Sequence, residues 1–296
     1  MCDLLKESRS SYYRHWRACA PREEETALRD QVQRLALANR HYGYRRLGAM
    51  LRLEGFVVNH KRLLRMMRED NLLCLRQRPF VPMTTTSDHP WPVVPNRLRG
   101  IRPTACDQIW VADITYVRLR QGFVYLAIVL DAFSRKVVGW AMAQTLEAVL
   151  AVEALQRALA DRRPPPGLIH HSDQGSQYAC RHYRDLLERH GLQASMSRPG
   201  NPYDNAKAES FMATLKREQI DGRLYRDLPE AAADIGRFLD EVYNGQRLHS
   251  ALGYRSPEQF EADLQEPSDK SGGGAARSQG SAPPPLRNTI APFNPA

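Results

Sequence analysis

Three carboxylates are the residues in this sequence whose types and spacing could do chemistry: Asp113, Asp173 and Glu209. Asp113 interrupts an apolar run, Ile109–Ile114, so its charge needs a cation, hydrogen bonds or a bound proton to offset desolvation. Taken alone, such an aspartate is more often a hydrogen-bonded structural residue. Carboxylate oxygens are also the ligands that hard divalent cations prefer. We predict that the three acids form one metal site.

The expected order of elements would bring these acids together. Three strand-like runs joined by short turns predict an antiparallel meander, and helices and strands then alternate. The expected elements are strands at 108–119, 122–133 and 135–143, a helix at 146–160, a strand at 167–171, a helix at 176–190, a strand at 193–197, the helix of Glu209 and a last helix at 228–243.

This order is that of the ribonuclease-H-like α/β fold, in which a five-stranded mixed sheet is flanked by helices. In that fold the fourth strand lies beside the first, so Asp113 and Asp173 would be neighbours. The helical spacing at 146–160 predicts that Val149, Val152, Leu155 and Leu159 face inward. The last helix is interpreted mainly as packing, through Ile235, Phe238, Leu239 and Val242.

Other candidate sites are weaker. His171, Ser172 and Asp173 are consecutive, and consecutive strand residues point to opposite faces, so they cannot form a catalytic triad. His170 and His171 lack the spacing of a zinc pair. Asp131, at the end of the second strand, is interpreted as structural or as a neighbour of the site.

Positive charge is concentrated in the first third of the chain. Residues 1–100 hold 19 Lys and Arg against 10 Asp and Glu, whereas residues 101–296 hold 23 of each. A clustered positive excess usually neutralises phosphate, which favours a nucleic-acid-binding segment. The sequence has no apolar run long enough to span a membrane and no signal-peptide pattern at its start. The five scattered cysteines indicate reduced thiols. We therefore expect a cytoplasmic protein.

The basic segment is expected to be helical, with helices at 24–39, 45–54 and 60–70. Gly55 closes the second helix, and Asn59 caps the third. In that third helix basic side chains lie opposite Leu63, Leu64 and Met67, which is typical of a helix-turn-helix-like DNA reader. A solvated charged face is an equally good interpretation. The predicted DNA contacts are Lys61, Arg62, Arg65, Arg68, Arg45 and Arg46.

Composition predicts four regions. A helix-turn-helix-like DNA-binding region covers 1–75, and a proline-rich linker covers 76–106. The ribonuclease-H-like catalytic domain covers 107–265. A low-complexity tail rich in Gly, Ser, Pro and Ala covers 266–296 and is expected to be disordered.

Several motifs together resemble the DDE transposases of bacterial insertion sequences, specifically the OrfB-type catalytic subunit of two-frame elements, and more distantly retroviral integrases. The resemblance covers roughly residues 8–265. It rests on Trp110–Tyr116, His171–Tyr178, Gly200-Asn201-Pro202 with Asp204-Asn205-Ala206, Glu209-Ser210-Phe211 with Leu215-Lys216, Tyr243–Pro257, His41–Arg46 and Asn59–Arg62.

The resemblance implies an enzyme that cleaves and joins DNA at the ends of its own mobile element. Asp113, Asp173 and Glu209 would hold two Mg²⁺ ions, for which Mn²⁺ could substitute. Lys216 lies two helical turns after Glu209, on the same face, and would reach a phosphate. The implied partners are double-stranded DNA (terminal inverted repeats and target), further copies of the protein on that DNA, and an upstream-frame partner or fusion, at the nucleoid rather than at a membrane.

Two alternatives remain open. The chain could be a DNA-binding regulator or architectural protein with an inactive ribonuclease-H-like domain, which would bind DNA with no Mg²⁺-dependent product. It could also be a ribonuclease-H-type nuclease acting on RNA–DNA hybrids. The 35 residues 174–208 between the second and third acids, and the basic helical region, favour the transposase over that nuclease.

Overall fold

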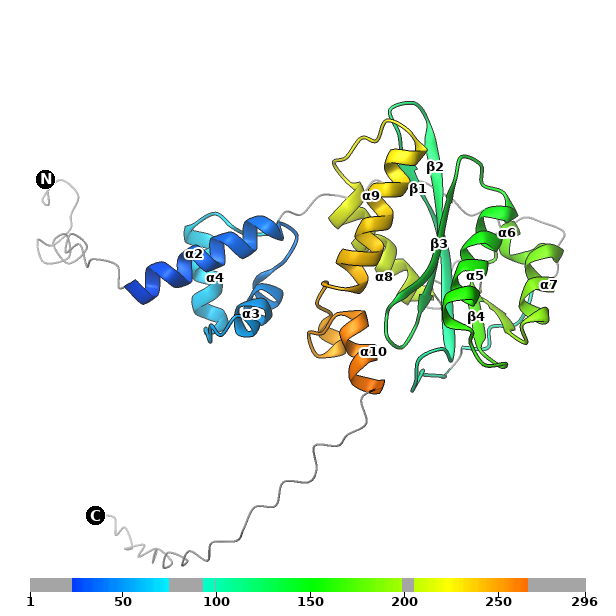
Figure 1. Cartoon of the computed structure of the whole chain (residues 1–296), viewed down its shortest axis with the longest axis horizontal. Coiled ribbons are helices and arrows are strands. Elements are labelled where there is room, and N and C mark those ends of the chain that lie inside the picture. Colours follow the sequence, from blue (N-terminus) through cyan, green and yellow to red (C-terminus); the bar gives the residue numbers. More distant parts are fainter. Residues whose placement is uncertain (1–22, 75–92, 99, 199–204, 266–296) are drawn as a thin grey trace, which may run out of the picture.

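In the part of the chain that the computed structural model describes, three helices come first and an α/β sheet follows them (Figure 1). The structure describes residues 23–74, 93–98, 100–198 and 205–265. The expected tail, most of the proline-rich linker and the turn at 199–204 lie outside the described residues. Within those ranges, no helix combines the length and apolar character that crossing a membrane requires.

The three helices bury one small core. They are α2 (Glu23–Ala38), α3 (Tyr44–Leu53) and α4 (His60–Glu69). Val32, Leu47 and Leu63 are fully buried at their contacts. The predicted cap is confirmed, because the side chain of Asn59 accepts a hydrogen bond from the backbone N–H of Lys61 at 2.8 Å. The expected helix-turn-helix-like arrangement of α3 and α4 is therefore present.

The sheet has five strands in the order β3-β2-β1-β4-β5. They are β1 (Ile109–Arg118), β2 (Phe123–Asp131), β3 (Val137–Ala143), β4 (Ile169–Ser172) and β5 (Gln193–Met196). The β1–β2 and β2–β3 pairs are antiparallel, whereas β1–β4 and β4–β5 are parallel. The predicted ribonuclease-H-like topology is confirmed, with the fourth strand beside the first.

Helices cover both faces of the sheet (Figure 1). One face packs against α5 (Ala148–Arg162), α6 (Ser176–Ala179) and α7 (Arg181–Arg189). The other packs against α8 (Ala206–Leu215) and α9 (Leu228–Arg237), with the π-helical segments Lys216–Ile220 and Phe238–Asn244. After these come a short 3₁₀ turn (Ser250–Leu252) and α10 (Pro257–Gln265), which the sequence analysis did not predict.

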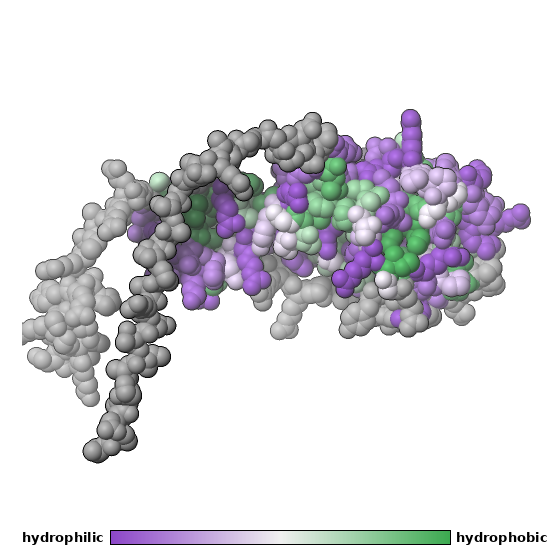
Figure 2. All heavy atoms as spheres, turned by 90° about the horizontal axis from the view of Figure 1, so that it is seen from below, coloured by the Kyte–Doolittle hydropathy of each residue, from purple (hydrophilic) through white to green (hydrophobic). Residues whose placement is uncertain are grey.

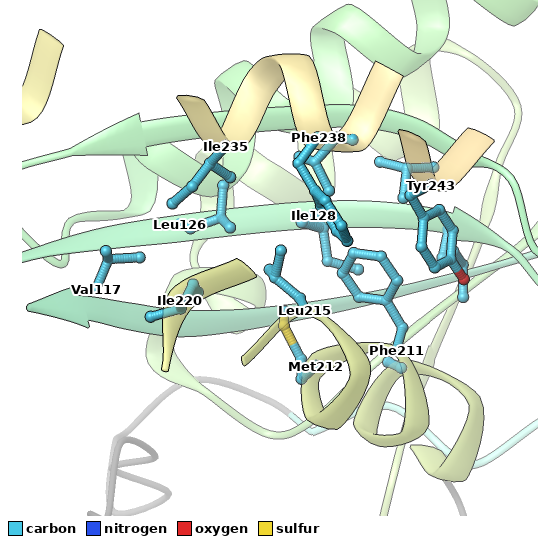
Figure 3. Close-up of a cluster of buried hydrophobic side chains, with 14 of the residues drawn as sticks. Val117, Leu126, Ile128, Phe211, Met212, Leu215, Ile220, Ile235, Phe238 and Tyr243 are labelled. Carbon is cyan, nitrogen blue, oxygen red and sulfur yellow. The ribbon is translucent and has the colours of Figure 1, made fainter. Parts of the chain in front are cut away.

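The core on the α8 side is built from alternate residues of the strands. Figure 3 shows Val117, Leu126 and Ile128 of the sheet facing Phe211 and Leu215 of α8. Because side chains alternate along a strand, the intervening residues of β1 pack on α5 and α7 instead. On the outside, hydrophilic residues cover much of the face in Figure 2, with hydrophobic patches between them.

The inward face predicted for α5 was wrong at one position. Val152, Leu155 and Leu159 are buried, but Val149 is 56% exposed. The buried stripe of α5 is centred on small residues, because the backbone of α5 comes very close to β3. A Cβ built on Gly139 would lie 2.3 Å from the carbonyl oxygen of Ala154. This approach sets the rotation of the helix and turns Val149 toward solvent.

The single helix predicted at 176–190 is two helices. Cys180 has an extended backbone (φ −64°, ψ 152°) and separates α6 from α7. In a continuous α-helix Tyr178 and Tyr183 would lie about 140° apart. The break allows both rings into the core, where their centroids are 5.4 Å apart.

The last predicted helix is α-helical only to Arg237 and then continues as a π-helix. Phe238, Leu239 and Tyr243 are all buried in this segment, whereas Val242 is only partly buried. The wider π turn shifts the phase of the side chains, which explains why these three positions share the core.

We predict that Gly139→Ala destabilises the protein by about 3 kcal/mol, because the added methyl overlaps the backbone of α5. Gly48→Ala is the matched control. It makes the same chemical change inside α3, where the new Cβ would lie at an ordinary 3.4 Å from Leu63, so it should be neutral or slightly stabilising. Urea unfolding measures both, and equal effects of the two variants would contradict this account of the β3–α5 contact.

Candidate active site

Asp113 lies in the middle of β1, the central strand of the sheet, which pairs with β2 and β4. It shares strand parity with Val111 and Val117, which face α8. Its carboxylate accepts a hydrogen bond from the backbone N–H of Ile114 at 2.9 Å. Burial raises the pKa of Asp113 to about 7, and the charges of Asp173 and Glu209 act in the same direction. The structure therefore places the other two predicted acids within electrostatic reach of Asp113.

Asp173 directly follows β4. Val111 pairs with His171 in the parallel β1–β4 ladder, so two more residues of the same register would place Asp173 beside Asp113 on one face. The Asp173 carboxylate accepts a hydrogen bond from Gly175 N–H at 3.0 Å, where α6 begins. His171 itself joins β4 to β5, because its ring nitrogens lie 2.9 and 3.1 Å from the hydroxyls of Ser195 and Ser197.

Glu209 is carried by α8 and is exposed. The helix is held against the sheet by Phe211 and Leu215, which are buried. Its first turn is tied to β1 by Asn205, whose side-chain amide donates to the carbonyl of Ala112 at 3.1 Å. Partial burial raises the pKa of Glu209. This hydrogen bond anchors α8 at Ala112, the residue before Asp113 in β1.

Asn205 is the functional residue whose role the sequence analysis missed. Asparagine is a common helix cap, but the Asn205 side chain makes no capping hydrogen bond within the described residues and crosses to β1 instead. Its Oδ1 atom is buried and has no hydrogen-bond partner among the residues that the structure describes. Among sequence signals, only the cluster of asparagines before the helix pointed to this position.

Lys216 lies where α8 changes into the π-helix. Its ammonium is 4.9 Å from the centre of the Tyr116 ring. Burial lowers the pKa of Lys216, and the negative charge of Asp113 acts in the opposite direction. The predicted lysine therefore shares the electrostatic environment of Asp113.

The residues suit a divalent cation by donor chemistry. The three acids offer only oxygen ligands, and Asp113 is a partly buried carboxylate with like charges nearby, a repulsion that a cation would relieve. As they stand, however, no three or more His, Cys, Asp or Glu side chains in the described ranges are arranged so that they could hold a metal ion. The acids share one electrostatic environment without yet forming a closed ligand set.

The rival carboxylate, Asp131, is fully engaged in structure. Its side chain is buried and accepts hydrogen bonds from the backbone N–H groups of Asp107, Phe133 and Ser134 at 2.7 to 2.8 Å, and from the Ser134 hydroxyl at 3.2 Å. These bonds form the corner between β2 and β3. Asp131 therefore has no role that points toward a ligand.

Four predicted DNA contacts lie exposed on α4: Lys61, Arg62, Arg65 and Arg68. Acids lie near two of them, since Glu25 is 4.0 Å from Arg62 and Glu69 is 3.6 Å from Arg65. Surface pairs of this kind are weak and are easily exchanged for phosphates.

The two predicted contacts on α3 differ from each other. Arg45 is exposed and packs over the ring of Tyr44. Arg46 is partly buried instead and lies 3.5 Å from Glu218, a residue of the π-helix after α8. The structure therefore separates Arg46 from the exposed basic face of α4.

Three protein families match successive parts of the chain. An HTH-like domain matches residues 22–80, and two Integrase core domain families match residues 103–202 and 190–257. A 31 kDa protein of insertion element IS600 from Shigella sonnei is 42% identical over 88% of this chain and 97% of its own length. Transposase InsF for insertion sequence IS3A of Escherichia coli is 36% identical over 88% of this chain and 92% of its own.

The chain belongs to the insertion-sequence transposases. The resemblance predicted from the motifs is confirmed, and so is its consequence that the protein is a DNA-binding enzyme of the DDE polynucleotidyl transferase class with an integrase core. Among solved structures, a simian T-cell lymphotropic virus intasome chain covers 85% of this transposase at 17% identity. The TM-score of that match is 0.47.

We predict that Asp113 makes the metal-free transposase less stable as pH rises. The pKa of its carboxyl is raised from an ordinary value of 3.8 to about 7 in the folded state, so between these values the folded state keeps a proton that the unfolded chain releases. The free energy of unfolding should therefore fall as pH rises from about 4 to about 7, by roughly 2 to 4 kcal/mol, and then level off.

Asp113→Asn removes this dependence, so the variant should match the wild type near pH 4 and exceed its stability near pH 8. Urea unfolding in EDTA at both pH values measures the difference. The control is Asp185→Asn, an exposed acid of α7, which should follow the wild type. A wild type and an Asp113→Asn variant with the same pH dependence would contradict the prediction.

Proposed function

We propose that this transposase performs 3′-end cleavage and strand transfer at the ends of its insertion sequence, with Asp113, Asp173 and Glu209 as the catalytic carboxylates. One observation carries the proposal. Asp173, at the end of the strand parallel to β1, and Glu209, on α8, both act on the charge of Asp113. The three acids are far apart in the chain. Such a gathering of like charges costs stability, and it is typical of functional sites.

The same three acids would hold the divalent ions, most simply two Mg²⁺. When bound, the ions supply an activated water or 3′-hydroxyl and stabilise the departing oxygen. Asp113 is fixed by the backbone of β1, and its hydrogen bond from Ile114 holds the carboxylate in one orientation. Asn205 positions α8, and with it Glu209, against β1. Lys216 would bind a DNA phosphate beside the acids, which its electrostatic interaction with Asp113 supports.

We further propose the domain organisation of 1–75 for DNA end binding, 76–106 as linker and 107–265 for catalysis, followed by the tail at 266–296. The separate helical core of α2–α4 and the sheet core support it. The exposed cations of α4 would contact the terminal inverted repeats, and several copies of the protein would assemble on the DNA. An upstream-frame partner or fusion belongs to the same proposal, as does association with the nucleoid.

A DNA-binding regulator with an inactive catalytic domain is the second candidate. The observation that favours it is the open arrangement of the acids, which do not form a ligand group within the described residues. Titration with Mg²⁺ separates the two functions, because only a transposase gives DNA products that depend on the metal.

Replacing any of the three acids by its amide should abolish catalysis and leave DNA binding intact. We expect Asp113→Asn, Asp173→Asn and Glu209→Gln each to lower cleavage and strand transfer by about a thousandfold or more, because each removes a charged ligand. A labelled duplex carrying the element end, incubated with Mg²⁺, gives both rates. The control Asp185→Asn should keep wild-type activity, and an active amide variant would remove that residue from the site.

The exposed cations of α4 should control affinity for DNA. Changing Lys61, Arg65 and Arg68 together to glutamine should weaken duplex binding at least tenfold. The slope of log affinity against log salt should fall by about 0.9 for each phosphate that the protein no longer neutralises. Fluorescence anisotropy in EDTA measures both quantities. Arg189→Gln, an exposed cation on α7, is the control. Unchanged slopes would mean that α4 faces away from the DNA.

A further inference from the structure

Two motifs that the catalytic site does not use meet on the other side of α8. The segment His41–Arg46 precedes and begins α3, and Arg247 and His249 follow the second π-helix. Glu218 joins them, because it forms two hydrogen bonds of 2.8 Å with the Arg247 guanidinium and lies 3.5 Å from Arg46. This ion pair connects the helical region to the catalytic region.

A pocket of about 210 Å³ opens at this junction. Its charged lining comes from four different segments: Arg46, Arg135, Lys207 and Arg247. Hydroxyl groups of α8 and the rings of Phe211 and Tyr243 complete the wall. Pockets for whole organic ligands are usually larger, about 300 to 1,000 Å³. We name this cavity the Arg135–Lys207 pocket.

The Arg135–Lys207 pocket has more positively charged side chains than carboxylates that could pair with them. Arg247 is buried and its guanidinium is satisfied by Glu218. Lys207 donates only to the carbonyl of Ala132, at 2.6 Å, and in the described part of the chain no carboxylate pairs with it or with Arg135. Asp131 acts on Lys207 at longer range, but backbone N–H groups already occupy its oxygens.

The cations of the pocket also act on His249, which lies in its lining. Burial and the charges of Arg247, Arg135 and Arg46 lower the pKa of His249 to about 3, so the ring is neutral. The same kind of repulsion lowers the pKa of Arg46, after burial, through Arg247. Several cations that repel one another around a small open pocket are stabilised when an anion binds among them.

This pocket is distinct from the carboxylate site. Lys207 and Glu209 are two positions apart on α8, which separates their side chains by about 200° around the helix. Lys207 shares its face with Ser210, Phe211 and Thr214, all of which line the pocket. One helix therefore presents an acidic site on one side and a basic pocket on another.

We propose that the Arg135–Lys207 pocket binds a backbone phosphate of DNA, held between Arg46 of the helical region and Lys207 and Arg135 of the catalytic region. The small volume suits one phosphodiester group, and the fork-shaped guanidinium of Arg135 suits its oxygens. A DNA strand held here would fix the helical region relative to the catalytic carboxylates. The inference rests on the DNA binding proposed above but not on the identity of the catalytic acids.

The test compares the double variant Arg135→Gln/Lys207→Gln with Arg181→Gln, an α7 cation that is 82% exposed on the other face of the sheet. Binding of a duplex carrying the element end is measured in EDTA over a range of salt concentrations. The double variant should bind about tenfold more weakly, with a salt slope reduced by about 1, and Arg181→Gln should match the wild type. An unchanged affinity and slope in the double variant would overturn the proposal.

Two further measurements keep the result interpretable. Thermal unfolding and circular dichroism verify the fold of the double variant, and the single Arg135→Gln replaces it if the double variant is unfolded. Inorganic phosphate should compete with DNA on the wild type and lose that effect in the variant. A different result would assign the pocket to a free anion instead: phosphate stabilises the wild type, but the substitutions leave the affinity for DNA unchanged. Glu209→Gln should bind DNA with wild-type affinity in EDTA. DNA binding therefore tests the pocket alone, and the metal-dependent reaction tests the catalytic acids.

Discussion

Asp113 places a partly buried carboxylate in the middle of the central strand, and two more acids act on its charge. Burying an uncompensated charge is among the most expensive arrangements in a protein, so the surrounding fold must hold it in place. The ladders on both sides of β1 and the large apolar clusters on both faces of the sheet provide that support. The raised pKa of Asp113 is the measure of the cost, and a bound cation would offset it.

Helix α8 transmits this constraint to the rest of the molecule. Its apolar face fixes it on the sheet, and Asn205 ties its first turn to β1 beside Asp113. Glu209 acts on the charge of Asp113, whereas Lys207 lies with the arginines that line the Arg135–Lys207 pocket. The change to a π-helix at Lys216 turns Glu218 toward Arg247 and Arg46. The helix thus links the carboxylate site to the junction with the helical region.

Much of the fold was predictable because local rules agreed with the global structure. The alternation of apolar residues predicted the strands, Asn59 predicted the start of α4, and the order of elements predicted the sheet topology. The failures occurred where a distant contact overruled local pattern. Val149 is exposed because Gly139 lets α5 approach β3, and Cys180 interrupts a helix so that two tyrosines can share a core. Gly139 and Ala154 belong to different elements, and the core that both tyrosines enter is completed by residues of the sheet and of α5.

The sequence by itself determined the residue types of the site, the family and the topology that makes Asp113 and Asp173 neighbours, because strand order follows from the order of elements. Only the tertiary structure decided that Asn205 crosses to β1, that Arg46 turns from the exposed basic face toward Glu218, and that five cationic or imidazole side chains surround one pocket. The physical reason is that these contacts join segments up to about two hundred residues apart. Their energies depend on desolvation and charge in the assembled fold, which local sequence does not encode.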